Sequence, residues 1–442
     1  MKALFDGVEK NRQLILQAER WIWQHPETGY REEQTSKYLE EKYKELGYEL
    51  VMAKDIPGFY TVVDTGRPGP TILVLGELDS LVCANHPDSN EKGYVHACGH
   101  NAQSACLLGI AAALKEPNAI DGLCGKIKLC AVPAEELIEI EYRKELLEKG
   151  VIHYLGGKPE FLYRGYFDDV DIAFMVHTST NFSSVRAAVG CIAKNVIYKG
   201  VAAHAGGSPW NGKNALYAAT QGLTAVNALR ETFKESDRIR FHPIIKQGGQ
   251  AVNAIPETVT IETYVRGISF EAILEANKKI NLALTGAALS IGCNVEIIDI
   301  PGYAPFENNV DLCQIAKEAG EIAIPEIPFN ITDNVSTGST DMGDLACVMP
   351  IIHPYIPGAQ GTSHGKDYNI VDPEMACVKN AKWQLAMLYL LLKDEGKRAK
   401  EVIANFTPQF KSKQEYFEFL DKNVSRKGDR IIYVDDKAQV TL

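Results

Sequence analysis

The stretch "HACGH" at residues 96–100 sets a thiol and an imidazole, Cys98 and His100, two positions apart just before an apolar run. Further carboxylate and imidazole side chains follow at the ends of apolar segments and in the late loop "GAQGTSHGKD": Glu135, Glu136, His177 and His364. Thiolate, imidazole and carboxylate groups bind divalent metal ions, and a hydrolytic site also needs a carboxylate that takes a proton from water. The pattern therefore predicts a metal-dependent hydrolytic site.

The adjacent pair Glu135 and Glu136 suits such a site because one glutamate can bind metal while the other takes the proton. Neighbouring residues inside a strand point to opposite faces, but at a strand end one carboxylate can bind metal while the other faces the water. Each residue alone also has an ordinary explanation, as a core histidine or a solvated helix face. A rival chemistry uses Cys98 as a nucleophile with His100, and it leaves the two glutamates without a role.

These side chains need a scaffold that brings distant segment ends together. Three apolar runs predict buried strands, with a helix over 102–115 between the first two: 71–79, 126–136 and 171–179. Alternating strands and helices predict an α/β domain with a mixed, largely parallel sheet and helices on both faces, whose sites lie at the carboxyl ends of the strands. We expect residues 1–190 and 301–400 to form this domain.

The middle of the chain, residues 191–300, has a different pattern. Its order, strand-helix-strand-strand-helix-strand, predicts a ferredoxin-like α+β domain inserted into the first. Residues 401–442 form a C-terminal extension with one possible strand, "RIIYV", and no role that the sequence assigns.

Composition excludes several classes of partner. The chain has 442 residues and a net charge of −11, which disfavours nucleic acids and anionic membranes as partners. No apolar run approaches the roughly 18 residues that a membrane span needs, and the first residues do not have the pattern of a signal peptide. Ten cysteines stand singly, as expected for reduced thiols, so we expect a cytoplasmic protein.

Longer motifs resemble one family in particular. "HACGH", "VPAEE", "GVAAHAGGSPWNGKNAL", "GGQAVNAIPE" followed by "VRG", and "GSTDMGD" followed by a late histidine are similar to the aminoacylase/carboxypeptidase family of metallopeptidases. The resemblance is strongest to its amidohydrolase branch, with auxin-conjugate and p-aminobenzoyl-glutamate hydrolases, and runs over roughly residues 10 to 395. It implies a catalytic α/β domain interrupted by a ferredoxin-like lid that often dimerises.

The resemblance also implies roles for individual residues. One or two divalent ions, Zn²⁺ or Mn²⁺, would be held by five side chains, with the Cys98 thiolate bridging: Cys98, His100, Glu136, His177 and His364. Glu135 would be the general base, and Asp79 would orient a ligand. On the lid, His204 would stabilise the oxyanion, while Asn253 and Arg266 would bind the substrate carboxylate. Arg266 could instead form a surface ion pair, Asn253 could be a turn residue, and His353 is a rival ligand.

Two departures from the branch pattern leave the substrate open. Asn101 and Gln103 stand where relatives carry Asp and His; we interpret Asn101 as a helix N-cap and Gln103 as a first-turn residue. Insertions occupy 82–94 and the stretch after the glutamates.

The predicted function is hydrolysis of an amide bond in N-acyl or N-aminoacyl amino acids or small dipeptides, by a homodimer joined through the lid. The alternative is a catalytically silent relative that acts as a binding or scaffold protein.

Overall fold

The computed structural model describes residues 1–423, 428–435 and 437–441. The chain divides into two compact units. The first unit comprises Met1–Ala187, Glu307–Ser336 and Thr340–Lys413. The second unit comprises Ala188–Phe306, Thr337–Ser339 and Gln414–Leu442.

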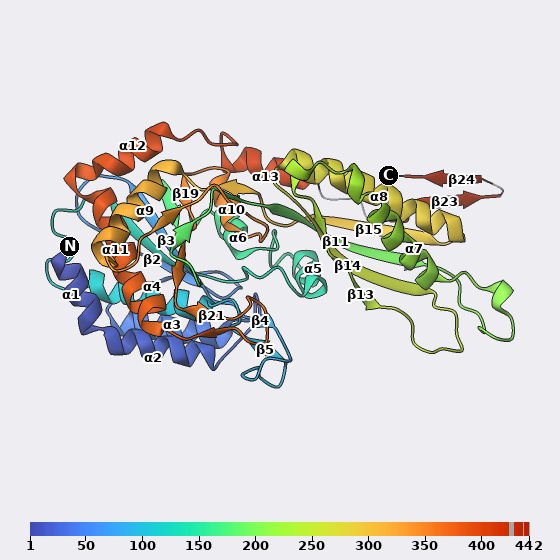
Figure 1. Ribbon diagram of the computed structural model, residues 1–442, viewed down its shortest axis with the longest axis horizontal. Helices are drawn as coiled ribbons and strands as arrows, with labels where there is room; N and C mark the ends of the chain where they lie inside the picture. The colour runs from blue at the N-terminus through green and yellow to red at the C-terminus, as the bar shows by residue number, and fades with distance from the viewer. Residues whose placement is uncertain (424–427, 436, 442) are drawn as a thin grey trace. The chain divides into compact units, whose positions relative to one another are not determined.

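The first unit is built on a six-stranded sheet (Figure 1). Its strands, in spatial order, are β1 (Val51–Met52), β2 (Phe59–Asp64), β6 (Lys126–Val132), β3 (Thr71–Glu77), β7 (Ile172–Phe174) and β19 (Ile351–Ile352). The last four are parallel, whereas β2 runs antiparallel to β6 and to β1. Every residue of β3 is buried, which explains its uninterrupted apolar sequence. The prediction of a mixed α/β fold is confirmed.

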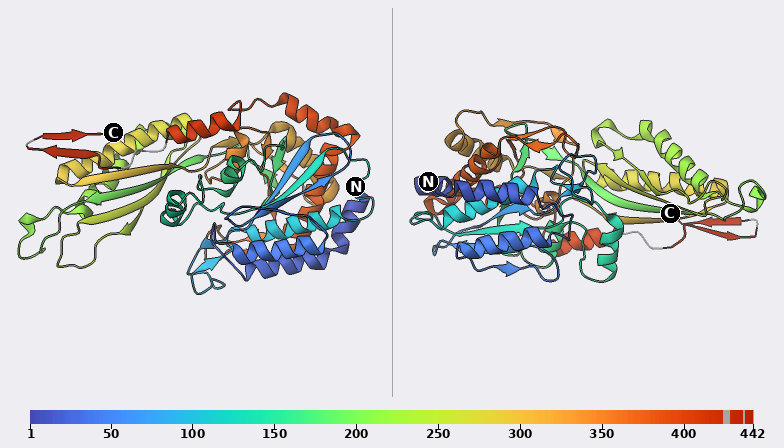
Figure 2. Two further views of the ribbon diagram at one scale, coloured as in Figure 1. Left: turned by 180° about the vertical axis from the view of Figure 1, so that it is seen from behind. Right: turned by 90° about the horizontal axis from the view of Figure 1, so that it is seen from below.

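Helix α4 (His100–Leu114) is the central helix of the first unit, and all of its residues are buried. It packs on β3 and contacts α1 (Lys2–Lys10), α2 (Arg12–Trp23) and α11 (Asn380–Leu392). Figure 2 shows the blue N-terminal helices lying alongside the cyan α4. A helix that is apolar on all sides needs such complete coverage, and the coverage holds its first turn in a fixed place. Within the described residues, none of the helices combines the length and apolar character needed to cross a membrane.

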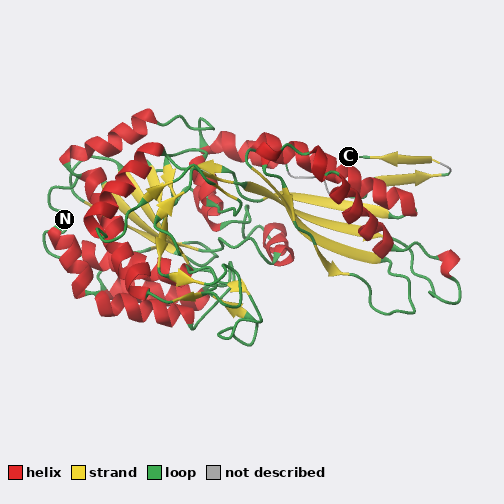
Figure 3. Cartoon of the chain, viewed as in Figure 1, coloured by secondary structure: helices red, strands yellow, loops and turns green. Residues whose placement is uncertain are grey.

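The second unit contains an antiparallel sheet with two helices packed side by side on it (Figure 3). The elements follow the order β11 (Gly190–Lys199), α7 (Ala215–Ala228), β12 (Arg240–Phe241), β13 (Ile244–Gln247), β14 (Thr258–Gly267), α8 (Phe270–Ile291) and β15 (Asn294–Pro301). The sheet order is β12-β14-β11-β15, with β13 also paired to β14. The second strand of the predicted order is divided into β12 and β13 at Pro243, which has no N–H for the ladder.

The C-terminal residues belong to both units. Helix α12 (Lys397–Asn405) contacts α11 in the first unit. Helix α13 (Lys413–Lys422) follows, and the expected strand "RIIYV" is found as β23 (Ile431–Val434), paired with β24 (Lys437–Val440). Ile431 is buried in the core of the second unit, and Arg430 N donates to Val295 O at 2.8 Å. The tail is therefore an integral part of the fold.

Candidate metal centre

The turn between β5 (Tyr94–Val95) and α4 sets Cys98 and His100 at the carboxyl side of the sheet. Gly99 is the N-cap of α4, with φ +85°, a conformation that favours glycine. A Cβ at this position would lie 2.0 Å from Thr178 Oγ1 in β8 (His177–Ser179). Glycine therefore lets the turn approach β8 closely enough to bring Cys98 beside His177.

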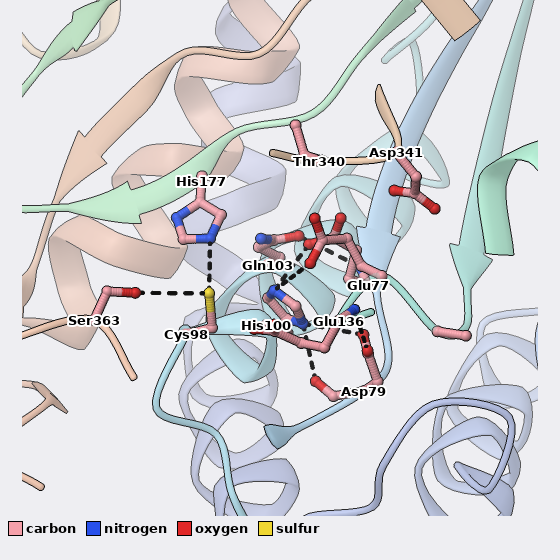
Figure 4. A network of polar contacts seen from close by, with 12 residues as sticks. Glu77, Asp79, Cys98, His100, Gln103, Glu136, His177, Thr340, Asp341 and Ser363 are labelled. Atoms are coloured by element: carbon pink, nitrogen blue, oxygen red, sulfur yellow. Dashed lines mark hydrogen bonds and ion pairs between the residues drawn. The ribbon is translucent and has the colours of Figure 1, made fainter. Parts of the chain in front are cut away.

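The five predicted metal ligands form two groups, and within each group the ligand atoms lie within 4.8 Å of one another. One group contains Cys98, His100 and His177, with 3.3 Å between Cys98 Sγ and His177 Nε2 (Figure 4). The other contains Cys98, Glu136 and His364, with 3.1 Å between His364 Nε2 and Glu136 Oε1. Because Cys98 Sγ belongs to both groups, its position suits a ligand shared by two ions.

A third group of possible ligands consists of Glu77, His100 and Glu135. Glu77 is already engaged, since its Oε1 lies 2.5 Å from the ammonium of Lys158 and both side chains are fully buried. A cation so close disfavours a further metal ion at this group. Glu135 Oε2 lies 3.9 Å from His100 Nε2, beside the first group. Glu135 therefore lies beside the Cys98, His100 and His177 group without belonging to it.

Neighbouring groups orient both histidines of the first group, the buried His100 and the half-buried His177. His100 Nδ1 lies 2.9 Å from Asp79 O and 3.1 Å from Asp79 Oδ1, so a proton on Nδ1 is donated there and Nε2 faces the cluster. His177 Nδ1 lies 2.8 Å from Thr178 O, which directs its Nε2 to Cys98 in the same way. Asp79 Oδ2 also accepts from Glu136 N at 2.7 Å. Asp79 thus contacts two of the predicted ligand residues, His100 through its side chain and Glu136 through the backbone N–H of Glu136.

The charges of the cluster favour a thiolate at Cys98. Burial and the Glu136 carboxylate oppose ionisation of this thiol, but His177 and His100 outweigh them and lower its pKa to about 5. A thiolate, three imidazoles and a carboxylate are donors that suit Zn²⁺ and related divalent ions, so the side chains present fit a metal.

The adjacent glutamates experience opposite effects. Burial, followed by Glu77 and Glu136, raises the pKa of Glu135 well above its usual value. Burial also acts on Glu136, but His364 outweighs it and lowers the pKa of Glu136. Environments that separate the pKa values of two carboxyls are typical of sites where one takes part in proton transfer and the other stays ionised.

His364 is held in a conformation that few non-glycine residues adopt, with φ +62°. Its backbone N–H donates to Ala97 O at 2.9 Å, which ties the late loop to the turn carrying Cys98. Strained residues of this kind are concentrated at functional sites. His353, the rival ligand, is in none of the three groups; its ring centroid lies 5.8 Å from that of His177.

The three site residues predicted on the lid all lie in the second unit. His204 is exposed, and its Nδ1 accepts from Gly207 N at 2.8 Å. Asn253 lies next to it in a turn, where its carbonyl accepts from Ala205 N. Arg266 Nη1 donates to Ser339 Oγ at 3.1 Å. Among the ion pairs of the described residues none includes Arg266, so the interpretation of Arg266 as half of a surface pair is not supported.

Other buried residues around the site were missing from the sequence prediction. Lys158 lies between two carboxylates, because it pairs with Asp341 as well as with Glu77. Glu77 and Asp341 were detectable in principle, since they lie in "GELD" and in the quoted motif "GSTDMGD". Lys158 lies inside the stretch after the glutamates that departs from the family pattern, and nothing in its sequence context indicated a buried charge.

The interpretation of Asn101 as an N-cap is wrong. Gly99 is the cap, and Asn101 lies inside α4, where its Nδ2 donates to Glu19 Oε1 at 2.7 Å. The N-cap of α4 lies two residues before Asn101 because only glycine fits the left-handed position beside Thr178. Gln103 Oε1 accepts from Glu77 N at 3.4 Å. Neither amide is in a ligand group.

Comparison with known proteins is consistent with this arrangement. Residues 73–388 match Peptidase family M20/M25/M40. The chain is 32% identical over 280 residues to the Xaa-Arg dipeptidase of Mus musculus, an alignment covering 62% of this chain but less than two thirds, 60%, of that one. It is 29% identical over 372 residues to the Homo sapiens Xaa-Arg dipeptidase, covering 79% and 78% of the two chains.

A bacterial relative and a solved structure extend the comparison. The chain is 26% identical over 347 residues to the indole-3-acetyl-aspartic acid hydrolase of Enterobacter agglomerans, covering 65% of this chain and 74% of that one. A dinuclear metal-binding peptidase of the M20 family from Bacillus subtilis shares the fold with a TM-score of 0.63 and 18% identity, covering 89% and 99%. The predicted resemblance is confirmed: the chain belongs to Peptidase family M20/M25/M40 and is a metal-dependent amidohydrolase of that family.

Proposed function

We propose that the protein hydrolyses the amide bond of N-acyl or N-aminoacyl amino acids or of small dipeptides. The observation that carries this proposal is the pair of ligand groups that share Cys98, with Glu135 beside them outside both. Such an arrangement combines sites for divalent ions with a separate carboxylate able to move a proton. The Xaa-Arg dipeptidases and the indole-3-acetyl-aspartic acid hydrolase support an amino acid as the leaving portion of the substrate.

The proposed ligands are Cys98, His100, Glu136, His177 and His364, holding two divalent ions with Cys98 shared. The thiolate favours Zn²⁺ by its softness, and Mn²⁺ is the alternative that the oxygen and nitrogen donors accept. When bound, the metal polarises the scissile carbonyl and makes a water molecule acidic enough to react near neutral pH. Asp79 keeps His100 and the backbone of Glu136 in place for ligation.

Glu135 is the proposed general base. It takes one proton from the attacking water as the oxygen bonds to the carbonyl carbon, and it delivers that proton to the nitrogen when the C–N bond breaks. The products are a carboxylic acid and an amine. Burial, followed by Glu77 and Glu136, raises the pKa of Glu135, and a carboxylate with a raised pKa is a stronger proton acceptor.

The substrate carboxylate is assigned to Arg266 and Asn253, and the oxyanion to His204. The Arg266 guanidinium offers a planar fork to a carboxylate, which a lysine cannot match. We further propose that the second unit forms the interface of a homodimer. A cytoplasmic location is part of the proposal, since all ten cysteines are free and Cys98 must remain reduced.

The test is to purify the protein without chelator, measure bound metal, and follow hydrolysis of N-acyl amino acids and dipeptides with Zn²⁺, Mn²⁺ or Co²⁺ restored. We expect up to two ions per chain and turnover only of substrates with a free carboxylate. Sub-stoichiometric metal with carboxylate binding but no turnover would instead support a silent binding protein. Alkylation of Cys98 that stops activity while leaving the metal bound would support the cysteine nucleophile.

A further inference from the structure

The segment after β6 leaves the sheet and returns to its starting point. Gly157 N donates to Ala134 O at 3.3 Å, and a Cβ on Gly157 would lie 1.7 Å from Pro133 O, so the two ends are in close contact. We call residues 135–156 the excursion. Glu135 and Glu136 are its first two residues, so the conformation of the excursion determines where both carboxylates lie.

The residue that starts the excursion has an unusual backbone. Ala134 is buried and has φ +59°, in the left-handed region that residues with a Cβ rarely occupy. Its N–H donates to Oε1 of the buried Glu32 at 2.8 Å. Such a conformation persists only where the surroundings hold it, because an unrestrained chain would relax to a commoner one.

Arg143, in α5 (Ile140–Glu148) of the excursion, is the side chain that holds this turn from the other side. It is 1% exposed. Its Nη1 donates to Leu155 O at 2.6 Å and to Ala134 O at 3.3 Å, and its Nη2 donates to Glu136 O. One planar guanidinium therefore joins the beginning of the excursion, its end, and the backbone of a proposed metal ligand.

Close packing fixes the guanidinium in this position. Arg143 Cζ lies 5.5 Å from the centroid of the Tyr30 ring, whose hydroxyl donates to Tyr154 O and Gly156 O at the returning end of the excursion. Gly29 makes the space, since a Cβ there would lie 2.4 Å from Arg143 Nη2. A lysine could not reproduce these contacts, because one ammonium cannot span three carbonyls in a fixed plane.

We propose that Arg143 is a positioning residue for Glu135 and Glu136, which it places through their backbone without touching substrate. The inference rests on the proposed function. Its hydrogen bonds reach the turn bearing Glu136, whereas His100 and His177 lie in α4 and β8 and Cys98 lies in the turn just before α4. Arg143 therefore governs the ion of the Cys98, Glu136 and His364 group, and has little influence on the ion of the Cys98, His100 and His177 group.

The test compares Arg143→Lys and Arg143→Met with wild type and with Arg164→Met as a matched control. Arg164 also bonds the excursion, through Nη2 to Val151 O at 2.6 Å, but its other contacts are to Glu160 and Lys54, away from the glutamate turn. Zn²⁺ titrations against a competing chelator measure the two affinities separately, and initial rates give kcat and KM. Arg143→Lys keeps the charge and supplies the result if Arg143→Met does not fold.

In the Arg143 variants we expect one ion to bind about 10- to 100-fold more weakly, which is the usual effect of removing a group that orients a ligand. The other affinity should stay within about twofold, and kcat should fall at least about tenfold with little change in KM. Arg164→Met should match wild type in all four quantities. Wild-type affinities and kcat in folded Arg143→Lys, or equal weakening of both ions, would overturn the inference. A wild-type protein without metal or turnover would refute the proposed function itself.

Discussion

Replacing Lys158 by methionine tests the buried charge network beside the metal centre. The Lys158 ammonium lies 2.5 Å from Glu77 Oε1 and also pairs with Asp341, and all three side chains are fully buried. Burial disfavours the ammonium, but Asp341 and Glu77 outweigh it and raise the pKa of Lys158 above its usual value. Lys158→Met keeps most of the volume while leaving two carboxylates without their cation.

The expected cost is large because the charges have no access to water. Removing one partner of a buried ion pair typically costs about 3–5 kcal/mol, since the remaining charge stays buried and uncompensated. In wild type this stabilisation is complete below the unfolded lysine pKa of about 10.4 and is lost only as pH rises through the higher folded value. The wild-type contribution of the lysine should therefore be constant between about pH 7 and pH 9, whereas Asp341, whose pKa burial raises to about 6, takes up a proton at lower pH.

Urea denaturation at pH 8 and pH 5 measures the free energy of unfolding of each variant. At pH 5 the loss in Lys158→Met should be smaller than at pH 8, because a buried carboxyl without its cation takes up a proton as the pH falls. Adding Asp341→Asn should restore part of the loss at pH 8. The matched control is Lys10→Met: Lys10 is 68% exposed in its pair with Glu116, so it should cost less than about 1 kcal/mol after solvent screening. A Lys158→Met loss no larger than the control would refute the reasoning.

Three further predictions concern the reaction. Glu135→Gln should lower kcat by about 10²–10⁴-fold in rate assays, because an amide does not accept the proton. The metal content, measured by mass spectrometry, should stay at the wild-type value. Full activity of this variant would refute the role of Glu135 as general base. Dialysis against a chelator should abolish turnover, and Zn²⁺ or Mn²⁺ should restore it; undiminished activity of metal-free protein would contradict the role of the ligand groups. Arg266→Lys should raise KM at least about tenfold for substrates with a free carboxylate, through loss of the bidentate fork. C-terminally amidated analogues should show no such difference between the two proteins, and equal effects on both substrates would exclude carboxylate recognition by Arg266.

The local sequence pattern was sufficient to predict much of the structure of the first unit. The buried strand β3 and the helix α4 follow from uninterrupted apolar residues, because a fully covered element tolerates few polar groups. The chemistry-bearing residues at segment ends also pointed to a common edge, since parallel strands end on the same side of their sheet. The family followed from the order of several motifs, each too short to be specific alone.

The local sequence pattern did not predict where the backbone turns sharply or a strand is interrupted. Asn101 has the residue type of an N-cap, yet the N-cap of α4 is Gly99, a position that the close approach of Thr178, far away in the sequence, reserves for glycine. Pro243 divides an edge strand that periodicity alone presents as continuous. Local pattern also did not indicate where the C-terminal residues dock on the second unit, since Arg430 bonds Val295 and Phe419 packs on Phe270, both far away in the sequence.

Sequence by itself determined which residue types could bind metal and move a proton, because those capacities belong to the side chains. Only the tertiary structure decided how these roles are divided among the residues. Cys98 belongs to two ligand groups, and Glu135 and Glu136 have opposite electrostatic environments. It also decided that Lys158 and Arg143 are buried beside them. Burial and charge proximity depend on contacts between distant segments, and no local pattern specifies those contacts.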